Sequence, residues 1–339
     1  MPLRLVVPDL HVDREGLESA ATADLPRLPT LEALLRFGST EPVRADWREM
    51  LLDLAGRGDL VGVPPAQRVA AARGVAEPDS AWFATPVHLV AGLDHLRLHP
   101  AGVLRLDDAA RAALVAGFAR CFGGEGLSLH DLGTGFLLSG LRGVVASTRD
   151  PAGLLGVNLR DAPAVGPGAG RLRRLSSELE MWLHQQSADG ALSARGLAPN
   201  GLWLWGGGPP PVPGILLEAS PGRALGRSLF ADVPCAAAAW SLGGGAAQPL
   251  PQAVSAVLEI AGCGAVEACA CVEVTQRHPG DVPLQRFEAQ WLEPAVAALR
   301  AGSLDVLRLH LAGRQWRLQR PFGWQRWRRA RPWWDVLAT

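Results

Sequence analysis

Apolar residues in the first part of the chain follow the spacing of a strand and then that of a helix. Residues 3–7 form a short apolar run of the length of a buried strand, and this run leads to Asp9. In residues 30–36, leucines recur at helical spacing and share one face. The pattern predicts a fold that opens with a buried strand and an amphipathic helix.

The second half of the chain alternates between the two kinds of pattern. Helices are expected at residues 178–185 and 284–300, and strands at residues 266–274, 306–311 and 315–318. Such alternation is typical of an α/β protein whose sheet is covered by helices.

Residues 86–139 differ from both flanks, because alternating apolar positions are followed by an alanine-rich run. We expect strands, a turn at residues 100–102, and a helix from about Asp107 to Phe118, with Asp107 as its N-cap. This segment therefore predicts a small α+β group of its own.

The run from Asn200 to Gly208, NGLWLWGGG, combines a strand pattern with a glycine turn. Alternation places Trp203 and Trp205 on one face of the strand, and the glycines allow the backbone to approach another segment or a ligand closely. The size of the indole rings favours a structural role as core anchors. The alternative is that Asn200, Trp203 and Trp205 line a ligand-binding pocket.

Composition and charge exclude several classes of protein. Of the 339 residues, 48% are apolar, which is ample for a globular core. The net charge is zero, so no overall field draws the protein to nucleic acid or to a membrane. The charge-free runs at residues 196–217 and 233–258 are broken by prolines and glycines. We therefore expect no membrane-spanning segment.

The cysteines indicate a reducing compartment. They are odd in number and form no CxxC pair, and the start of the chain does not follow the pattern of a secretory signal. Reduced, mostly buried thiols are therefore expected in a cytoplasmic protein. The five cysteines are Cys121, Cys235, Cys263, Cys269 and Cys271.

Several segments, taken in order, resemble a known family. Residues 25–38 read LPRLPTLEALLRFG, and the helix-like ELEMWLHQ at residues 178–185 is followed by the NGLWLWGGG element. This order resembles the archaeal-type cofactor-independent phosphoglycerate mutases of the alkaline phosphatase superfamily. It resembles more closely the RpfE-type regulatory proteins of bacteria. The resemblance implies an α/β fold, an alkaline-phosphatase-like mixed-sheet core flanked by helices.

The same resemblance implies how the chain is divided. Ala101 and Gly102 match a turn in the subdomain that is inserted in the mutases. The implied organisation is a smaller α+β subdomain at residues 86–149, inserted in a core that is made of residues 1–85 and 150–339.

The metal ligands of the mutases are matched only in part. By resemblance, Asp9 takes the place of the first metal-binding aspartate. The later phrase CVEVTQRHPGD retains His278 but has Gln276 near the place of a ligand aspartate, and VLRLHLAG retains His310. Asp9, His278 and His310 imply at most one weakly bound divalent metal, because two sites need more carboxylate and imidazole ligands. Each of the three also has an ordinary structural interpretation.

The nucleophile of the mutases has no counterpart. Residues 61–74 read VGVPPAQRVAAARG, with Pro64, Pro65 and Ala66 where an Asn-Ser pair is expected. Phosphoryl transfer in that family needs an activated oxygen beside metal ions. No catalytic residue is therefore predicted.

Two further groups are candidates for ligand or anion binding. His88, Asp94 and His95 could hold an anion or a metal, or they could be hydrogen-bonded surface residues. Arginines and tryptophans alternate after residue 314, which suits phosphates and stacked rings. The other interpretation is a last strand that buries tryptophan and exposes arginine. The arginines singled out for binding are Arg326, Arg328 and Arg329.

The sequence thus favours a non-catalytic regulatory protein, a pseudoenzyme, that acts on an unknown protein or anionic partner. One alternative is a metal-dependent phosphoglycerate mutase or phosphatase with an altered site. A second is a binder of nucleic acid or anions through the arginine- and tryptophan-rich C-terminal part, which zero net charge does not favour.

Overall fold

The computed structural model describes residues 1–8, 26–43, 46–154, 157–188, 197–209, 227–261, 267–274, 283–320 and 331–337. They belong to two compact units, one formed by residues 1–58 and 220–339 and the other by residues 59–219. The second unit contains the whole of the predicted insert, 86–149, and extends beyond it on both sides.

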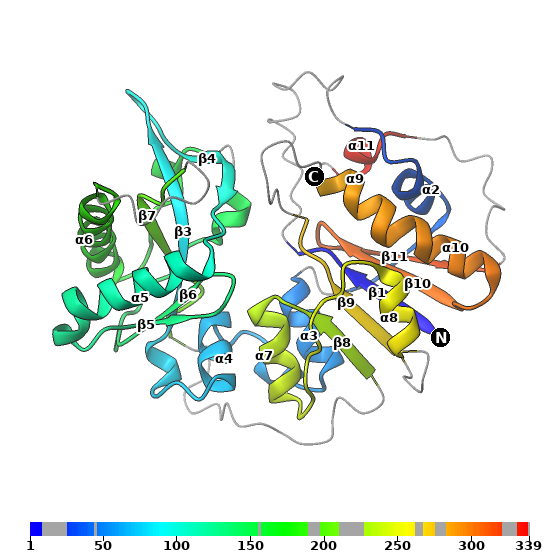
Figure 1. The fold of residues 1–339 in the computed structure, drawn as a ribbon, viewed down its shortest axis with the longest axis horizontal. Coiled ribbons are helices and arrows are strands. Elements are labelled where there is room, and N and C mark those ends of the chain that lie inside the picture. The colour runs from blue at the N-terminus through cyan, green and yellow to red at the C-terminus, as the bar shows by residue number, and fades with distance from the viewer. Residues whose placement is uncertain are drawn as a thin grey trace. The chain divides into compact units, whose positions relative to one another are not determined.

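The first unit is built on a six-stranded mixed sheet in the order β2-β11-β10-β1-β9-β8 (Figure 1). β10, β1, β9 and β8 run parallel, whereas β11 and β2 continue the sheet in antiparallel pairing. The strands are β1 (Pro2–Val6), β2 (Ser39–Glu41), β8 (Arg227–Ala231), β9 (Glu267–Cys271), β10 (Val306–Leu311) and β11 (Arg314–Gln319).

The two faces of this sheet differ in chemistry. Leu5, Ala270 and Leu309 point to an apolar face, where they pack with α2, α8, α9, α10 and α11 in one core cluster. The strand period of two puts the neighbouring residues on the other face. The helices of the unit are α2 (Pro29–Phe37), α3 (Trp47–Leu54), α7 (Pro234–Leu242), α8 (Val254–Ala261), α9 (Pro283–Phe287), α10 (Glu293–Ala301) and α11 (Trp333–Leu337), with a π-helical turn, Glu288–Leu292, between α9 and α10.

The second face of the sheet carries a buried ionic network. Arg4 on β1, with 8% of its surface exposed, donates from Nε and Nη2 to Glu267 Oε1 at 3.3 and 3.2 Å. Its Nη1 donates to Gln315 Oε1 on β11 and lies 3.8 Å from Met50 Sδ of α3. Arg308 on β10 contacts Glu267 as well, at 3.5 Å. Side chains of β1, β9, β10 and β11 are therefore tied together across the sheet.

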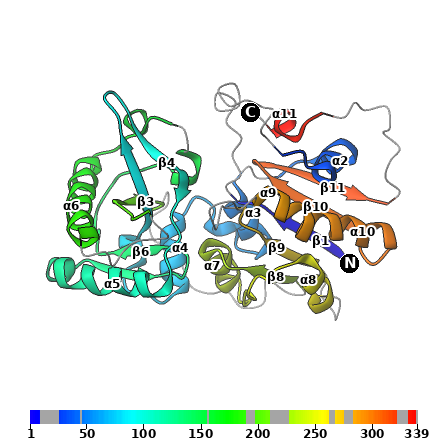
Figure 2. The same cartoon turned by 45° about the horizontal axis from the view of Figure 1, so that its top comes forward.

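The second unit contains an antiparallel sheet in which the long strand β3 is central (Figure 2). β3 pairs with β6 and β4 along one path and with β7 outside it, and β5 pairs with β6. The elements are α4 (Pro65–Ala72), β3 (Trp82–Ala91), β4 (Leu96–Val103), α5 (Asp108–Phe122), β5 (Ser128–Asp131), β6 (Phe136–Ser139), α6 (Ala169–Ala188) and β7 (Gly201–Trp205).

An aromatic cluster joins helices α5 and α6 to each other. Phe118 and Phe122 of α5 stack at 4.7 Å between ring centroids, and both meet the Trp182 ring of α6 edge-on. Asp107 caps α5 by accepting from Ala110 N at 2.8 Å. The predicted cap is thus confirmed, and the helix runs one turn beyond its predicted end.

Most of the predicted elements of the α/β class are confirmed, including β1, α2, β10 and β11. The predicted turn at residues 100–102 is wrong as a chain reversal, because these residues lie within β4 (Leu96–Val103), where the pairing with β3 is interrupted between Leu98 and Val103. The chain reverses at residues 92–95, where Gly92 N donates to the His95 carbonyl at 2.8 Å. Gly102 has a φ of 68° in this interruption, so the Pro-Ala-Gly sequence marks an irregularity within β4.

Membrane spans were not expected, and the structure gives the same result for its described residues. No helix among them combines the length and apolarity that crossing a bilayer requires.

The N-terminus of α2 depends on a distant carboxylate. Leu28 occupies the N-cap position and offers no side-chain cap, whereas the buried Glu288 accepts a hydrogen bond from Thr30 N. We expect Glu288→Ala to lower the free energy of unfolding by about 1–3 kcal/mol, because it leaves a helix-terminal amide without an acceptor. Urea unfolding measures this, with the exposed Gln285→Ala of α9 as the control, expected to stay within about 0.5 kcal/mol of wild type. Equal effects of both variants would contradict the capping role.

Candidate functional site

Of the predicted metal ligands, only His310 lies among the described residues. It sits near the carboxyl end of β10 with 1% of its surface exposed, on the face of the sheet that carries Arg4. The register places it beside Val6 of β1 and Gln315 of β11. Asp9 and His278 lie outside the described residues.

The described residues do not provide a complete metal-binding set. Nowhere in that part of the chain do three His, Cys, Asp or Glu side chains come together as a metal ion needs. The neighbours of His310 in the sheet offer an aliphatic side chain and an amide. His310 therefore does not gain further ligands from the adjacent strands that are described.

The segment matched to the mutase nucleophile forms the start of α4. Ala66 and Gln67 are fully buried there, and Pro64 occupies the N-cap position. Ala66 N donates to the Gly206 carbonyl at 2.9 Å, and Gln67 Nε2 donates to the carbonyls of Gly208 at 2.5 Å and Asp79 at 3.2 Å. The Ala66 amide and the Gln67 side chain at this helix start therefore already donate to carbonyl groups of the protein.

The glycines after β7 make this closure possible. Gly206 and Gly208 have φ values of 71° and 111°, in the region that favours glycine. A Cβ on Gly206 would lie 3.1 Å from Pro65 Cγ of α4, and one on Gly207 would lie 2.4 Å from the Trp82 ring. The close approach predicted for this turn is therefore an approach to α4 and β3.

Trp203 and Trp205 lie on one face of β7 and are half-buried, whereas Leu202 and Leu204 enter the core. Trp205 Nε1 donates to Thr85 Oγ1 at 2.8 Å, and Trp203 Nε1 donates to the Arg149 carbonyl at 2.9 Å. Both indole N–H groups are therefore held within the protein.

The side chain of Asn200 extends the pairing of β7 with β3. Its Oδ1 accepts from Leu89 N at 2.6 Å and its Nδ2 donates to Leu89 O at 2.9 Å, as a backbone partner would. This bond lies where the register of β3 and β4 shifts between Val87 and Leu89. The described geometry thus gives Asn200 a structural part.

The histidines of the β3–β4 hairpin form two separate groups. His88 Nδ1 lies 2.7 Å from the Ala198 carbonyl, and its ring meets the His99 ring edge-on at 5.7 Å. Asp94 and His95 lie in the turn, where Asp94 Oδ1 is 2.8 Å from His95 Nδ1. This bond lowers the pKa of the exposed Asp94 carboxyl. β3 ends at Ala91, before Asp94, so Asp94 does not share a strand face with His88.

The arginine- and tryptophan-rich part is described only at its two ends. Arg326, Arg328 and Arg329 lie outside the described residues. Trp316 on β11 is 2% exposed, and Trp333 of α11 is buried with Nε1 donating to the Pro26 carbonyl at 2.9 Å. These two tryptophans serve the core.

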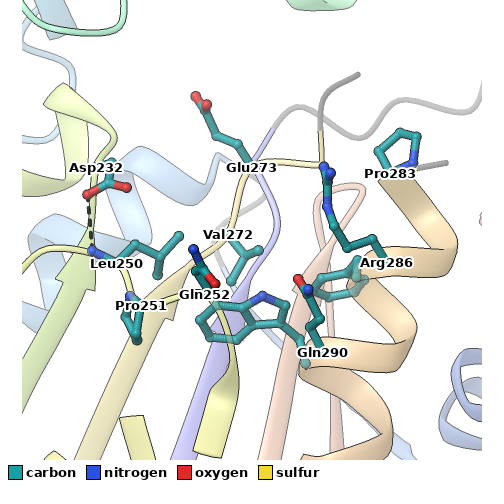
Figure 3. A pocket seen from close by; sticks show the side chains of 11 residues that line it. Asp232, Leu250, Pro251, Gln252, Val272, Glu273, Pro283, Arg286 and Gln290 are labelled. Atoms are coloured by element: carbon teal, nitrogen blue, oxygen red, sulfur yellow. Dashed lines mark hydrogen bonds between the residues drawn. The ribbon is translucent and has the colours of Figure 1, made fainter. Parts of the chain in front are cut away.

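A cavity of about 330 Å³ lies beyond the carboxyl ends of β8 and β9 (Figure 3). This strand-end cavity is formed entirely by the first unit. Its polar wall comes from the strand ends, the loop before α8, α9 and the π-helical turn, and its floor includes Val272 and Trp291. The polar lining residues are Asp232, Gln252, Glu273, Arg286 and Gln290.

The wall of the strand-end cavity is fixed at Asp232. Its Oδ1 accepts from Leu250 N at 3.0 Å, which holds the loop before α8 against the end of β8. Glu273 lies two residues after Cys271, the last residue of β9. Ligands of open α/β sheets bind outside the carboxyl ends of parallel strands.

None of the residues predicted from sequence lines this cavity. A usable signal was nevertheless present, because Asp232 and Glu273 come one and two residues after the ends of buried strands. The family resemblance drew attention to other positions, and the alignment of strand ends became visible only with the sheet order.

Similar proteins were sought in three ways. No family model matches the chain, and no curated protein matches it. Among solved structures it is similar to the cofactor-independent phosphoglycerate mutase from Thermoplasma acidophilum DSM 1728, with 15% identity over 95% of this chain and 89% of that one and a TM-score of 0.39. It is also similar to the PH0037 protein from Pyrococcus horikoshii, with 13% identity over 91% and 81% of the two chains and a TM-score of 0.42. Neither likeness indicates what this chain binds.

The hydrogen bonds that close the start of α4 can be tested through the free energy of unfolding. We expect Gln67→Ala to lower the free energy of unfolding by about 1–3 kcal/mol, because the carbonyls of Gly208 and Asp79 lose a buried donor. Chemical unfolding followed by circular dichroism measures the change. Arg73→Ala, on the exposed end of the same helix, is the matched control. A loss no larger than that of the control would refute the closure.

The described cysteines should differ sharply in reactivity. Cys121 is an exposed free thiol, whereas Cys269 is 2% exposed and burial raises its pKa to about 12. Cys269 is therefore both protonated and shielded from a reagent at about pH 8, whereas the Cys121 side chain is accessible. We expect iodoacetamide to label Cys121 and to spare Cys269 in the folded protein, as peptide mass spectrometry would show. Equal labelling of both before unfolding would contradict the burial of Cys269.

Proposed function

We propose that this chain is a non-catalytic regulatory protein that binds a ligand or partner on a scaffold like that of the cofactor-independent phosphoglycerate mutases. It acts in the cytoplasm, in keeping with the free thiols of the described Cys121 and Cys269. The regulatory role follows the resemblance of the NGLWLWGGG element to the RpfE-type regulatory proteins.

One observation carries the proposal. The start of α4, which the resemblance matches to the mutase nucleophile, holds Pro64, Pro65 and Ala66 and has no hydroxyl or thiol side chain. Its donors are spent on the carbonyls of Gly206 and Gly208. A phosphoryl group would need both an attacking oxygen and open donors at that place.

The metal positions support the same proposal in a weaker way. The register partners of His310 in the sheet are Val6 and Gln315, which offer an aliphatic side chain and an amide. If Asp9 and His278 join it, the result is one site of three protein ligands. Two-metal chemistry requires a second ion about 3.5–4 Å from the first.

The proposal is tested by turnover. Purified full-length protein is assayed with 3-phosphoglycerate and with p-nitrophenyl phosphate in the presence of Mn²⁺, Mg²⁺, Zn²⁺ or Co²⁺. We expect no rate above the uncatalysed background, because the activated oxygen is missing. A cofactor-independent phosphoglycerate mutase assayed in parallel shows that the conditions support catalysis.

Metal-dependent turnover that is lost in Asp9→Ala would refute the proposal and establish the altered-site enzyme instead. Turnover that survives this substitution would point to a contaminating phosphatase, which repeated purification of wild type and variant distinguishes. The metal content of the purified protein, measured by mass spectrometry, gives an independent readout.

A further inference from the structure

We propose that the β3–β4 hairpin carries a binding site for a divalent transition-metal ion, formed by His88 and His99. The ligand class is an ion such as Zn²⁺, for which neutral imidazole is a suitable ligand. Both histidines belong to the second unit, whereas the positions matched to the metal ligands of the mutases belong to the first. The site therefore goes beyond the proposed function.

The two histidines come together where the pairing of β3 with β4 is interrupted. The register shifts between Val87 and Leu89 on β3, and Leu98 is the last partner on β4 before the interruption, so His88 and His99 border it. Val87 and Leu98 face a buried cluster, and the strand period of two puts both histidines on the other face, where they are half-buried. Irregularities of this kind re-aim side chains and are frequent beside functional sites.

The distance between the two rings suits one shared ion. The ring centroids of His88 and His99 are 5.7 Å apart, and the ring planes lie at 84° to each other. A zinc ion about 2.0–2.1 Å from one nitrogen of each of two imidazoles keeps the ring centres about 5–6 Å apart at a tetrahedral angle. The pair therefore has the spacing that two ligands of one ion require.

His88 is held in a tautomer that can bind a metal. Its Nδ1 lies 2.7 Å from the Ala198 carbonyl oxygen, which can only accept, so Nδ1 carries the proton. In the neutral ring the lone pair then belongs to Nε2. Metal-binding histidines commonly donate their other N–H to a carbonyl in this way, which fixes the ring. The segment that supplies this carbonyl is itself anchored, because Asn200 bonds to both backbone groups of Leu89.

His99 can supply the second nitrogen. An imidazole has two ring nitrogens, so an interaction of one within the protein leaves the other for a metal. Two protein ligands leave the remaining positions of the ion to water, which makes such a site weaker than one with three or four protein ligands. A site of this kind agrees with the result that no set of three metal-ligating side chains occurs in the part of the chain that is described.

Calorimetric titration of the full-length protein with Zn²⁺ tests the proposal. We expect one equivalent to bind at the hairpin, and His88→Gln and His99→Ala each to weaken that binding by about 10-fold or more, because each removes one of two protein ligands. Glutamine retains an N–H that can donate to the Ala198 carbonyl, so His88→Gln separates metal binding from that hydrogen bond. Mg²⁺, which prefers oxygen ligands, should not bind there.

The matched controls are other histidines and the exposed thiol. His95→Ala, in the turn of the same hairpin, and His184→Ala, exposed on α6, should bind Zn²⁺ as wild type does. Cys121→Ser should bind equally well, because the exposed thiol is not part of the site. As a second readout, Zn²⁺ should raise the Tm of wild type and leave that of His88→Gln unchanged, since an ion that binds only the folded state stabilises it.

Three results would overturn the proposal: no Zn²⁺ binding by wild type, unchanged affinity in both His88→Gln and His99→Ala, or loss of binding in His95→Ala, His184→Ala or Cys121→Ser. The proposed function is tested separately, because none of these results bears on turnover. Metal at the hairpin should be lost in His88→Gln and kept in Asp9→Ala, whereas metal at an altered mutase site should show the opposite behaviour.

Discussion

A buried arginine at the middle of the six-stranded sheet constrains the whole first unit. Arg4 lies on β1, between β10 and β9, and a charge in that place must be paired and hydrogen-bonded. Glu267 on β9 and Gln315 on β11 meet this need only in the observed strand register. A slip of one residue would turn Arg4 towards the apolar face and Leu5 away from it.

This register determines the chemistry of both faces and of the strand ends. With Arg4 on one face, Leu3 and Leu5 enter the core with α2, α8 and α10. The same alignment brings the ends of β8 and β9 level, since Ala231 pairs with Cys271. The acidic residues that follow these strands, Asp232 and Glu273, thereby both line the strand-end cavity.

How much of this could be predicted from sequence depends on the range of the interactions. β1, α2 and β10 were predictable because each buries residues at a regular spacing that is visible locally. The turn predicted at residues 100–102 was wrong as a chain reversal, because the Pro-Ala-Gly sequence marks an irregularity within β4, and its position in that strand depends on the pairs that β3 makes on either side. Asp107 was recognisable as a cap, whereas the capping of α2 by Glu288 joins residues 258 positions apart.

The candidate site was harder to predict for the same physical reason. Asp232, Gln252 and Arg286 come from segments that are brought together only by the order of the sheet and the packing of α9. The NGLWLWGGG element was conspicuous in the sequence, and its described contacts are with other segments of the protein. Its glycines bring carbonyl groups to the start of α4, and its Asn200 completes the pairing with Leu89.

The start of α4 and the strand-end cavity therefore differ in whether the chain itself closes them. At the start of α4, helix-terminal donors would bind an anion if they were open, and the chain supplies its own acceptors there. At the ends of β8 and β9, charges of both signs surround a space that no side chain fills. The strand-end cavity thus leaves open space beside the sheet, whereas the start of α4 is closed by carbonyl groups of the chain itself.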